Sequence, residues 1–112
     1  MRHEVRCPSG FLGACVLLLL AEAPRHGYQL IGPLKAFGFD WGGPGPIYQE
    51  LRKLDAAEFV HSSWERSQGP ARRVYEPTDS GMAALERYVR DVAELAVRLD
   101  GLVIEGERAV LI

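Results

Sequence analysis

The feature that most restricts the fold is a polar helix followed at once by two short strands. Residues 45–57 have the apolar spacing of a helix with one buried face. Residues 59–66 and 72–77 are rich in strand-forming residues, and a five-residue connection with a Gly-Pro pair suits a β-hairpin between them. Three residues at spacings of four and three mark the buried face of the helix: Ile47, Leu51 and Leu54.

A recognition helix with a wing behind it has this arrangement. The helix can enter the major groove of a duplex, while a cationic turn meets the phosphate backbone or the minor groove. A charged helix face alone is more often simply solvated, but the hairpin directly downstream favours DNA binding. Gln49 suits a paired contact to adenine, whereas arginines mostly position the duplex. Seven residues are the candidate DNA contacts: Tyr48, Gln49, Arg52, Lys53, Arg66, Arg72 and Arg73.

The distribution of charge agrees with this placement, although the net charge of the 112 residues is −2. Residues 79–112 contain seven acidic and four basic side chains, whereas residues 26–78 contain six of each. The acidity therefore lies away from the predicted DNA-binding surface. A local basic patch is enough for phosphate contact.

An apolar run at residues 11–20 allows two interpretations. With the basic residues before it and the small residues after it, the run resembles a secretory signal. However, Glu4 weakens the basic region, cleavage would leave a proline at the new terminus, and the run is too short to span a bilayer. We favour a helix over residues 9–22 that is buried on all sides. This predicts a cytoplasmic protein with no membrane partner, in which Cys7 and Cys15 are reduced.

The second helix is expected over residues 27–37, and Pro33 inside it is an anomaly. Proline removes a backbone hydrogen bond and clashes with the preceding turn, at a cost of roughly 3 kcal/mol in a helix interior. We therefore expect a kink or an early end there. The last helix should begin after Thr78, a suitable N-cap, with Asp79 in its first turn.

The last helix carries the most regular apolar pattern in the chain. Its apolar residues are separated by three and four residues in alternation, which is a heptad seam. Such a stripe must be buried, either against its own domain or against a second copy. We favour a homodimer, because the first three helices already supply a core. The residues of the seam are Leu85, Tyr88, Val92, Leu95, Leu99 and Leu102.

The sequence contains no recognisable catalytic residue grouping and no cofactor-binding motif. His26 precedes a helix and is expected to cap or pack, and His61 is expected to face solvent. Neither forms a metal pair with His3, and the glycines at 42–45 lack the lysine of a phosphate-binding loop. We therefore predict that the protein is not an enzyme and holds no metal.

With these residues in view, the chain resembles the PadR family of transcriptional regulators, over roughly residues 12–100. The order and spacing of the matching pieces carry the resemblance, since each is weak alone. They are Leu17 to Ala21, Pro24, His26-Gly27-Tyr28, Gly45-Pro46-Ile47-Tyr48, Leu51, Leu54, Trp64-Glu65, Gly69-Pro70-Ala71-Arg72-Arg73, Tyr75, Thr78 and Gly81.

The resemblance implies a mainly α fold with a small β-hairpin. Residues 1–78 would form a winged helix-turn-helix and residues 79–112 a C-terminal dimerisation helix, within a single compact domain. It also implies a repressor that binds a double-stranded DNA operator and is released by a small-molecule effector or another signal. Tyr48 would contact a phosphate, and Arg72 and Arg73 of the wing would meet the backbone. Tyr28 and Tyr75 would pack between helices and wing.

Two further expectations follow from the resemblance. Effector cavities of such dimers form where the first and last helices meet, so Phe11, Cys15 and Tyr88 are the candidate lining residues. Glu58 stands where the family usually has a glycine after the recognition helix. A left-handed backbone there costs a residue with a side chain on the order of 1 kcal/mol.

A different class of function is also compatible with the pattern. A winged-helix dimer can be a protein-protein interaction module, such as an anti-activator or scaffold, which uses the same helix on a protein partner. The low net charge favours this alternative, and the arginine cluster of the wing disfavours it.

Overall fold

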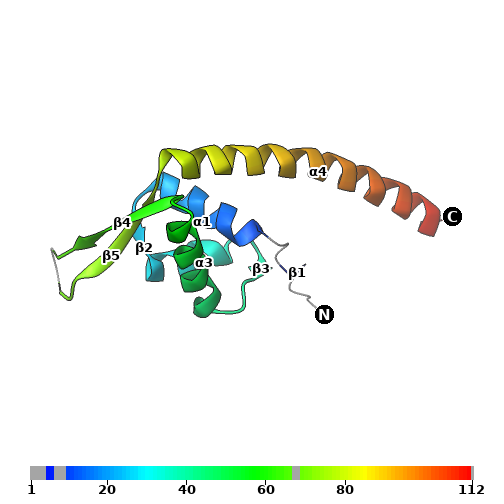
Figure 1. Cartoon of the computed structure of the whole chain (residues 1–112). Coiled ribbons are helices and arrows are strands. Elements are labelled where there is room, and N and C mark those ends of the chain that lie inside the picture. Colours follow the sequence, from blue (N-terminus) through cyan, green and yellow to red (C-terminus); the bar gives the residue numbers. More distant parts are fainter. Residues whose placement is uncertain (1–4, 7–9, 67–68, 112) are drawn as a thin grey trace.

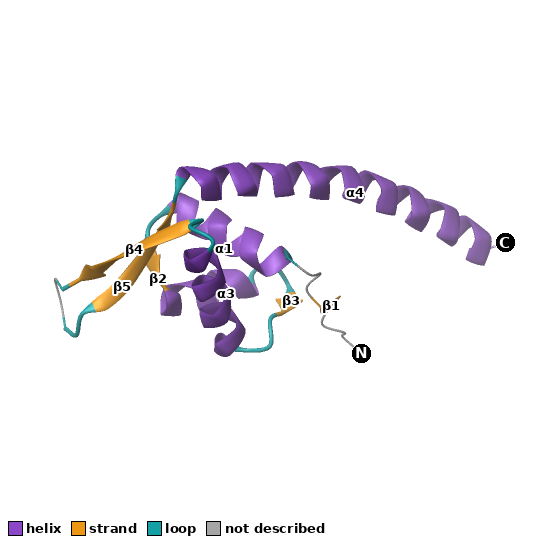
Figure 2. Ribbon diagram, viewed as in Figure 1, coloured by secondary structure: helices purple, strands orange, loops and turns teal. Residues whose placement is uncertain are grey.

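The computed structural model describes residues 5–6, 10–66 and 69–111, so His3 and Cys7 lie outside the described residues. The fold is mainly helical with a small antiparallel sheet, as the sequence predicted (Figures 1 and 2). In chain order the elements are β1 (Val5–Arg6), α1 (Phe11–Glu22), β2 (Arg25–His26), a 3-10 helix η1 (Gly27–Leu30), α2 (Ile31–Lys35), β3 (Phe39–Asp40), α3 (Pro44–Ala56), β4 (Val60–Glu65), β5 (Arg72–Pro77) and α4 (Asp79–Leu111).

Helix α1 lies at the centre of the domain, where it contacts α2, α3, α4 and β5. Val16 and Leu20 are almost completely buried, and buried residues occur on nearly every side of the helix. A helix that is apolar on all sides is shielded from water only when other elements surround it. Within the described residues, no helix is both long and apolar enough to cross a membrane. The interpretation of residues 11–20 as a buried helix is therefore confirmed.

The segment after α1 is helical but divided. The 3-10 helix η1 passes into α2, which ends at Lys35 rather than at the expected residue 37. Pro33 is the third residue of α2, in the first turn, where a backbone N–H would have no partner within the helix. The last turn tightens, because the N–H of Ala36 donates to the carbonyl of Pro33 at 3.1 Å. The helix therefore ends two residues before the expected residue 37, but it does not end at Pro33 itself, which is accommodated in the first turn.

Helix α3 ends in a left-handed residue, as expected. Glu58 has a φ of 61°. The N–H of Phe59 donates to the carbonyl of Leu54 at 2.8 Å, and that of Glu58 donates to the carbonyl of Asp55 at 3.0 Å. This pair of bonds is the Schellman motif that usually has glycine at the left-handed position. The chain thereby reverses direction and enters β4.

The hairpin forms within the two predicted strand ranges, and the sheet gains a third strand that was not predicted. Strands β4 and β5 pair from Val60 opposite Pro77 to Glu65 opposite Arg72. The two-residue strand β2 pairs with the other edge of β5, so the sheet order is β2-β5-β4. Strands β1 and β3 form a separate short parallel pair. The middle of β5 is therefore attached to the chain between α1 and η1.

The start of α4 is fixed against the end of α3. The hydroxyl of Thr78 accepts a hydrogen bond from the N–H of Gly81 at 3.0 Å, which confirms the predicted N-cap. The same hydroxyl donates to the carbonyl of Glu58 at 2.6 Å. A Cβ on Gly81 would lie 2.0 Å from the carbonyl oxygen of Phe59, so only glycine permits this approach.

Helix α4 extends well beyond the domain. Its 33 residues correspond to a rod of about 50 Å. Leu85 is buried against the domain, whereas Leu95, Leu99 and Leu102 are 53%, 49% and 67% exposed. Figure 1 shows the C-terminal half of α4 projecting away from the other elements. The proximal part of the seam thus packs on its own domain, and the distal part has no cover in one chain.

We predict that Gly81→Ala lowers the free energy of unfolding by about 3 kcal/mol, because the new methyl group collides with backbone that cannot move independently. Gly101→Ala is the matched control in the same helix, since a Cβ there would meet no atom of the described residues within 4 Å. That change should stabilise by up to about 1 kcal/mol. Urea unfolding of both variants measures the difference, and equal effects would contradict the close contact.

Candidate nucleic-acid interface

The sheet brings three separate segments together beside the middle of the hairpin. Strand β2 places Arg25 opposite Tyr75 and His26 opposite Val74. The chain then leaves the sheet at Gly27, while β5 continues past it to Arg73 and Arg72. The start of α3 packs against this point, because α3 contacts η1. Recognition helix and wing therefore meet where β2 ends.

A depression of about 410 Å³ opens at this meeting point. Two arginines, one histidine and three tyrosines contribute to its wall, and none of the lining residues is acidic. Such a wall presents mainly hydrogen-bond donors and positive charge, which suits an anionic group. The lining residues are His26, Gly27, Tyr28, Tyr48, Arg72, Arg73 and Tyr75.

Gly27 allows Tyr48 to lie in this wall. A Cβ on Gly27 would lie 2.5 Å from Cε1 of the Tyr48 ring, closer than any real contact of that kind. Gly27 is buried, and Tyr48 remains 40% exposed. The ring is thus held against the backbone at the start of η1 while its outer edge faces solvent.

The two wing arginines are held by different neighbours. Nη1 of Arg72 lies 3.1 Å from Nε2 of His26. Arginine can only donate, so the histidine nitrogen accepts this hydrogen bond. The guanidinium carbon of Arg73 lies 5.6 Å from the ring centroid of Trp64, its cross-strand partner, within the range of a cation-π interaction.

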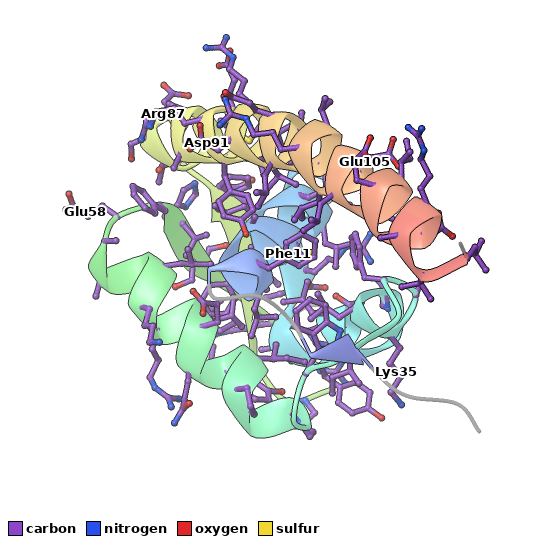
Figure 3. All side chains as sticks on the ribbon, turned by 90° about the vertical axis from the view of Figure 1, so that its right-hand side faces the viewer. Phe11, Lys35, Glu58, Arg87, Asp91 and Glu105 are labelled. Carbon is purple, nitrogen blue, oxygen red and sulfur yellow. The ribbon has the colours of Figure 1, made fainter. Side chains whose placement is uncertain are left out.

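A second, apolar cavity lies between α1 and α4. Its volume is about 270 Å³, and its wall includes Phe11, Cys15 and Tyr88, the three residues predicted from the resemblance. The ring of Phe11 contacts that of Tyr88, with centroids 6.2 Å apart, and stacks on that of Trp41 at 6.3 Å. Figure 3 shows Phe11 beneath α4, with Arg87 and Glu105 on the outer side of that helix.

Comparison with known families identifies the relationship. The model of the PadR-like transcriptional regulator family matches residues 16–87, more than half of the chain. The chain belongs to the PadR-like family of transcriptional regulators. Members of this family are DNA-binding regulators rather than enzymes, in agreement with the expectation from the sequence. The winged-helix interpretation of α3 and the hairpin is confirmed with it.

Individual relatives agree with this assignment. Transcriptional regulator Rv3488 of Mycobacterium tuberculosis is 36% identical over 78 residues, which span 70% of this chain and 62% of that protein. The crystal structure of TM0937, a conserved protein of unknown function described as a potential transcriptional factor, has a TM-score of 0.79 and 31% identity. The match covers 96% of this chain and all of TM0937. A PadR-like transcriptional regulator from Bacillus cereus, BC4206, gives 0.75 and 26%, over 84% and 92% of the two chains.

The predicted DNA contacts of this PadR-like chain fall into two groups. Tyr48, Arg72 and Arg73 line the depression beside the wing. The others are exposed but do not line it, and they are Gln49, Arg52, Lys53 and Arg66. Arg52 follows Tyr48 by one helical turn, so the two share a side of α3. Gln49 lies on the side of α3 away from the buried residues Ile47, Leu51 and Leu54.

Sequence reasoning assigned His26 only a capping or packing role. Its backbone N–H does donate to Oε1 of Gln29 at 3.1 Å at the start of η1, so the capping role is confirmed. The contact with Arg72, 46 residues away, was missed because β2 has two residues and no periodicity. The contact between Trp64 and Arg73 was also missed, although the register of the hairpin places these two residues opposite each other. Within the described residues, no three His, Cys, Asp or Glu side chains gather to hold a metal.

We predict that Gly27→Ala lowers the free energy of unfolding by about 1–3 kcal/mol, because the added methyl group meets the ring of Tyr48. In a Tyr48→Ala background the same change should cost less than about 1 kcal/mol, since the obstructing ring is gone. Urea unfolding of the two single variants and the double variant measures this coupling. Additive effects would show that the ring is not held against Gly27.

Proposed function

We propose that this protein is a dimeric repressor that binds a double-stranded DNA operator and releases it when a small molecule or another signal binds. Within it, residues 1–78 read the DNA and residues 79–112 form the dimerisation helix. The observation that carries the proposal is the depression shared by Tyr48 of α3 with Arg72 and Arg73 of the wing. A regulator of this kind acts on DNA in the cytoplasm.

The arrangement of α3 and the wing supports contact with one duplex on one side of the domain. The exposed polar side of α3 is suited to the major groove, with Gln49 as the base-reading residue. The wing arginines flank the start of that helix and are suited to the phosphate backbone. Two such units related by a twofold axis would engage half-sites about 34 Å apart, or a multiple of that spacing.

The exposed part of the α4 seam supports dimerisation. Leu95, Leu99 and Leu102 follow one another along one side of the helix, and all are about half exposed or more in the single chain. Ion pairs lie beside this stripe instead of within it. Glu86 pairs with Arg90, and Glu94 pairs with Arg98, which neighbours Leu95 and Leu102 on the helix surface. A continuous apolar stripe of this size is a typical protein interaction surface. A second copy of α4 offers the matching stripe.

The cavity between α1 and α4 supports the release step. Its wall is apolar, and its size is close to that of pockets for small ligands. It lies at the root of the helix proposed to form the dimer. A ligand that filled the cavity and contacted Phe11, Cys15 and Tyr88 would move α4 relative to α1. That movement would change the distance between the two DNA-binding units of the dimer.

We predict that binding to an operator fragment weakens steeply with salt. For six to eight phosphate contacts the slope of log K against log salt should be roughly −5 to −7. The double change Arg72→Ala and Arg73→Ala should reduce this slope and weaken binding at low salt. Arg87→Ala, an exposed arginine on the outer side of α4, is the matched control and should leave both unchanged. DNA captured from fragmented genomic DNA and sequenced supplies the operator for these gel shifts.

If no DNA is retained at any salt concentration, operator binding is excluded and the protein-protein interaction module becomes the better description.

We predict that Leu99→Glu converts the dimer to a monomer, because a carboxylate would be buried in the interface without a partner. Val97→Glu is the matched control: it makes the same chemical change two residues away, at a 73% exposed position on another side of α4. Sedimentation velocity at micromolar concentration measures both. Dissociation by the two variants alike, or by neither, would contradict the proposed interface.

A further inference from the structure

The two wing arginines differ in how they are held, and this difference carries an inference that rests on the proposed DNA-binding function. Successive residues of a strand point to opposite faces of the sheet. Arg73 shares a face with Trp64, its cross-strand partner. Arg72 shares the other face with Val74, the partner of His26 in β2. Both arginines nevertheless reach the depression, because it lies at the edge of β5 where β2 has ended.

We propose that the depression beside the wing is a pocket for a single backbone phosphate of DNA, and that His26 is the residue that positions Arg72 in it. The hydrogen bond from Nη1 of Arg72 to Nε2 of His26 occupies one of the five donors of the guanidinium group. The other donors of this group can still face a bound anion. An arginine already held in place loses less conformational freedom on binding than a mobile one.

His26 is suited to this role because its own position is fixed. It pairs with Val74 through β2, and its backbone N–H donates to Gln29. The side chain is partly buried, whereas the side chain of Arg72 is exposed. The imidazole is therefore a fixed acceptor for the guanidinium of Arg72, whose long side chain lines the same depression as Tyr48.

The chemistry of the wall favours a phosphate over the edges of adenine and cytosine. Those two bases present hydrogen-bond donors in the major groove, so reading them needs acceptor groups in the protein. The depression presents two guanidinium groups and tyrosine hydroxyls, with no carboxylate or amide side chain among its lining residues. Its one imidazole acceptor is already used by Arg72. A phosphodiester, which accepts hydrogen bonds and carries negative charge, fits this set.

The test is a double-mutant cycle on binding of the captured operator fragment by the full-length protein. Arg72→Ala should weaken binding about 10- to 100-fold at low salt, and His26→Ala about 2- to 10-fold. In the Arg72→Ala background, His26→Ala should change the affinity by less than about twofold, because there is no arginine left to position. In an Arg73→Ala background, His26→Ala should keep its full effect.

Two further measurements separate positioning from a merely structural role. The slope of log K against log salt should fall by about 0.9 per bound subunit for Arg72→Ala and in the same direction, by less, for His26→Ala. His26→Gln, which keeps an acceptor at similar reach, should restore most of the affinity. Urea unfolding of each variant shows whether the fold is retained.

Two outcomes would overturn this inference but leave the proposed function standing. One is an equal effect of His26→Ala with and without Arg72, and another is an affinity that His26→Ala leaves unchanged in a binding-competent protein. Absence of DNA binding by the unchanged protein would instead overturn the proposed function, and this inference with it.

Discussion

The apolar surface of α1 holds the other elements of the domain in place. This helix contacts α2, α3, α4 and β5, so the recognition helix, the wing and the long terminal helix all pack on one central rod. Each aliphatic side chain buried there contributes about 1.5–3 kcal/mol relative to exposure. Val16 and Leu20 on α1, with Leu51 on α3, are among the most deeply buried residues. A helix so fully surrounded fixes where its neighbours lie, and therefore where α3 and the hairpin point.

The turn between α3 and β4 is the second point on which the geometry depends. Its left-handed residue, Glu58, is stabilised from outside, because its carbonyl accepts hydrogen bonds from the hydroxyls of Thr78 and Ser80. The next carbonyl, that of Phe59, accepts from the N–H of Thr78. The end of the recognition helix and the start of α4 are thus joined by backbone contacts at one corner. A change in the direction of α4 would therefore move the C-terminal end of α3.

The sequence predicted the elements whose pattern is local. The all-apolar run of α1, the spacing of Ile47, Leu51 and Leu54, and the hairpin around its Gly-Pro connection each contain their own signal, and the structure confirms them. The anomaly at Pro33 was predictable for the same reason, because proline restricts its own backbone. The left-handed backbone at Glu58 was expected only from the resemblance, since the glutamate side chain itself disfavours it. Tyr48, Arg72 and Arg73 were correctly placed at one surface because helix and hairpin are adjacent in the chain.

What could not be predicted depends on contacts between distant residues. Strand β2 has two residues and exists only because β5 offers it an edge, so no pattern in its own sequence marks it. The contact of His26 with Arg72 depends on that pairing. The division of the α4 seam was also hidden, because heptad spacing does not say which turns pack on α1 and which project. Leu85 and Leu99 occupy equivalent places in the pattern, yet one is buried and the other is half exposed.

The projecting part of α4 has a consequence for how the protein behaves at different abundances. Beyond Val92, every described residue of this helix is exposed, a length of about five turns that a lone chain cannot shield from water. If a second copy supplies the shield, as proposed, thermal stability is linked by mass action to protein concentration. At low expression more of the protein would be monomeric and less stable, so it would be degraded faster. At the same low concentration its DNA target would be unoccupied. The amount of protein and the bound fraction of its DNA target would fall together, so the cellular concentration of this regulator would be part of its control.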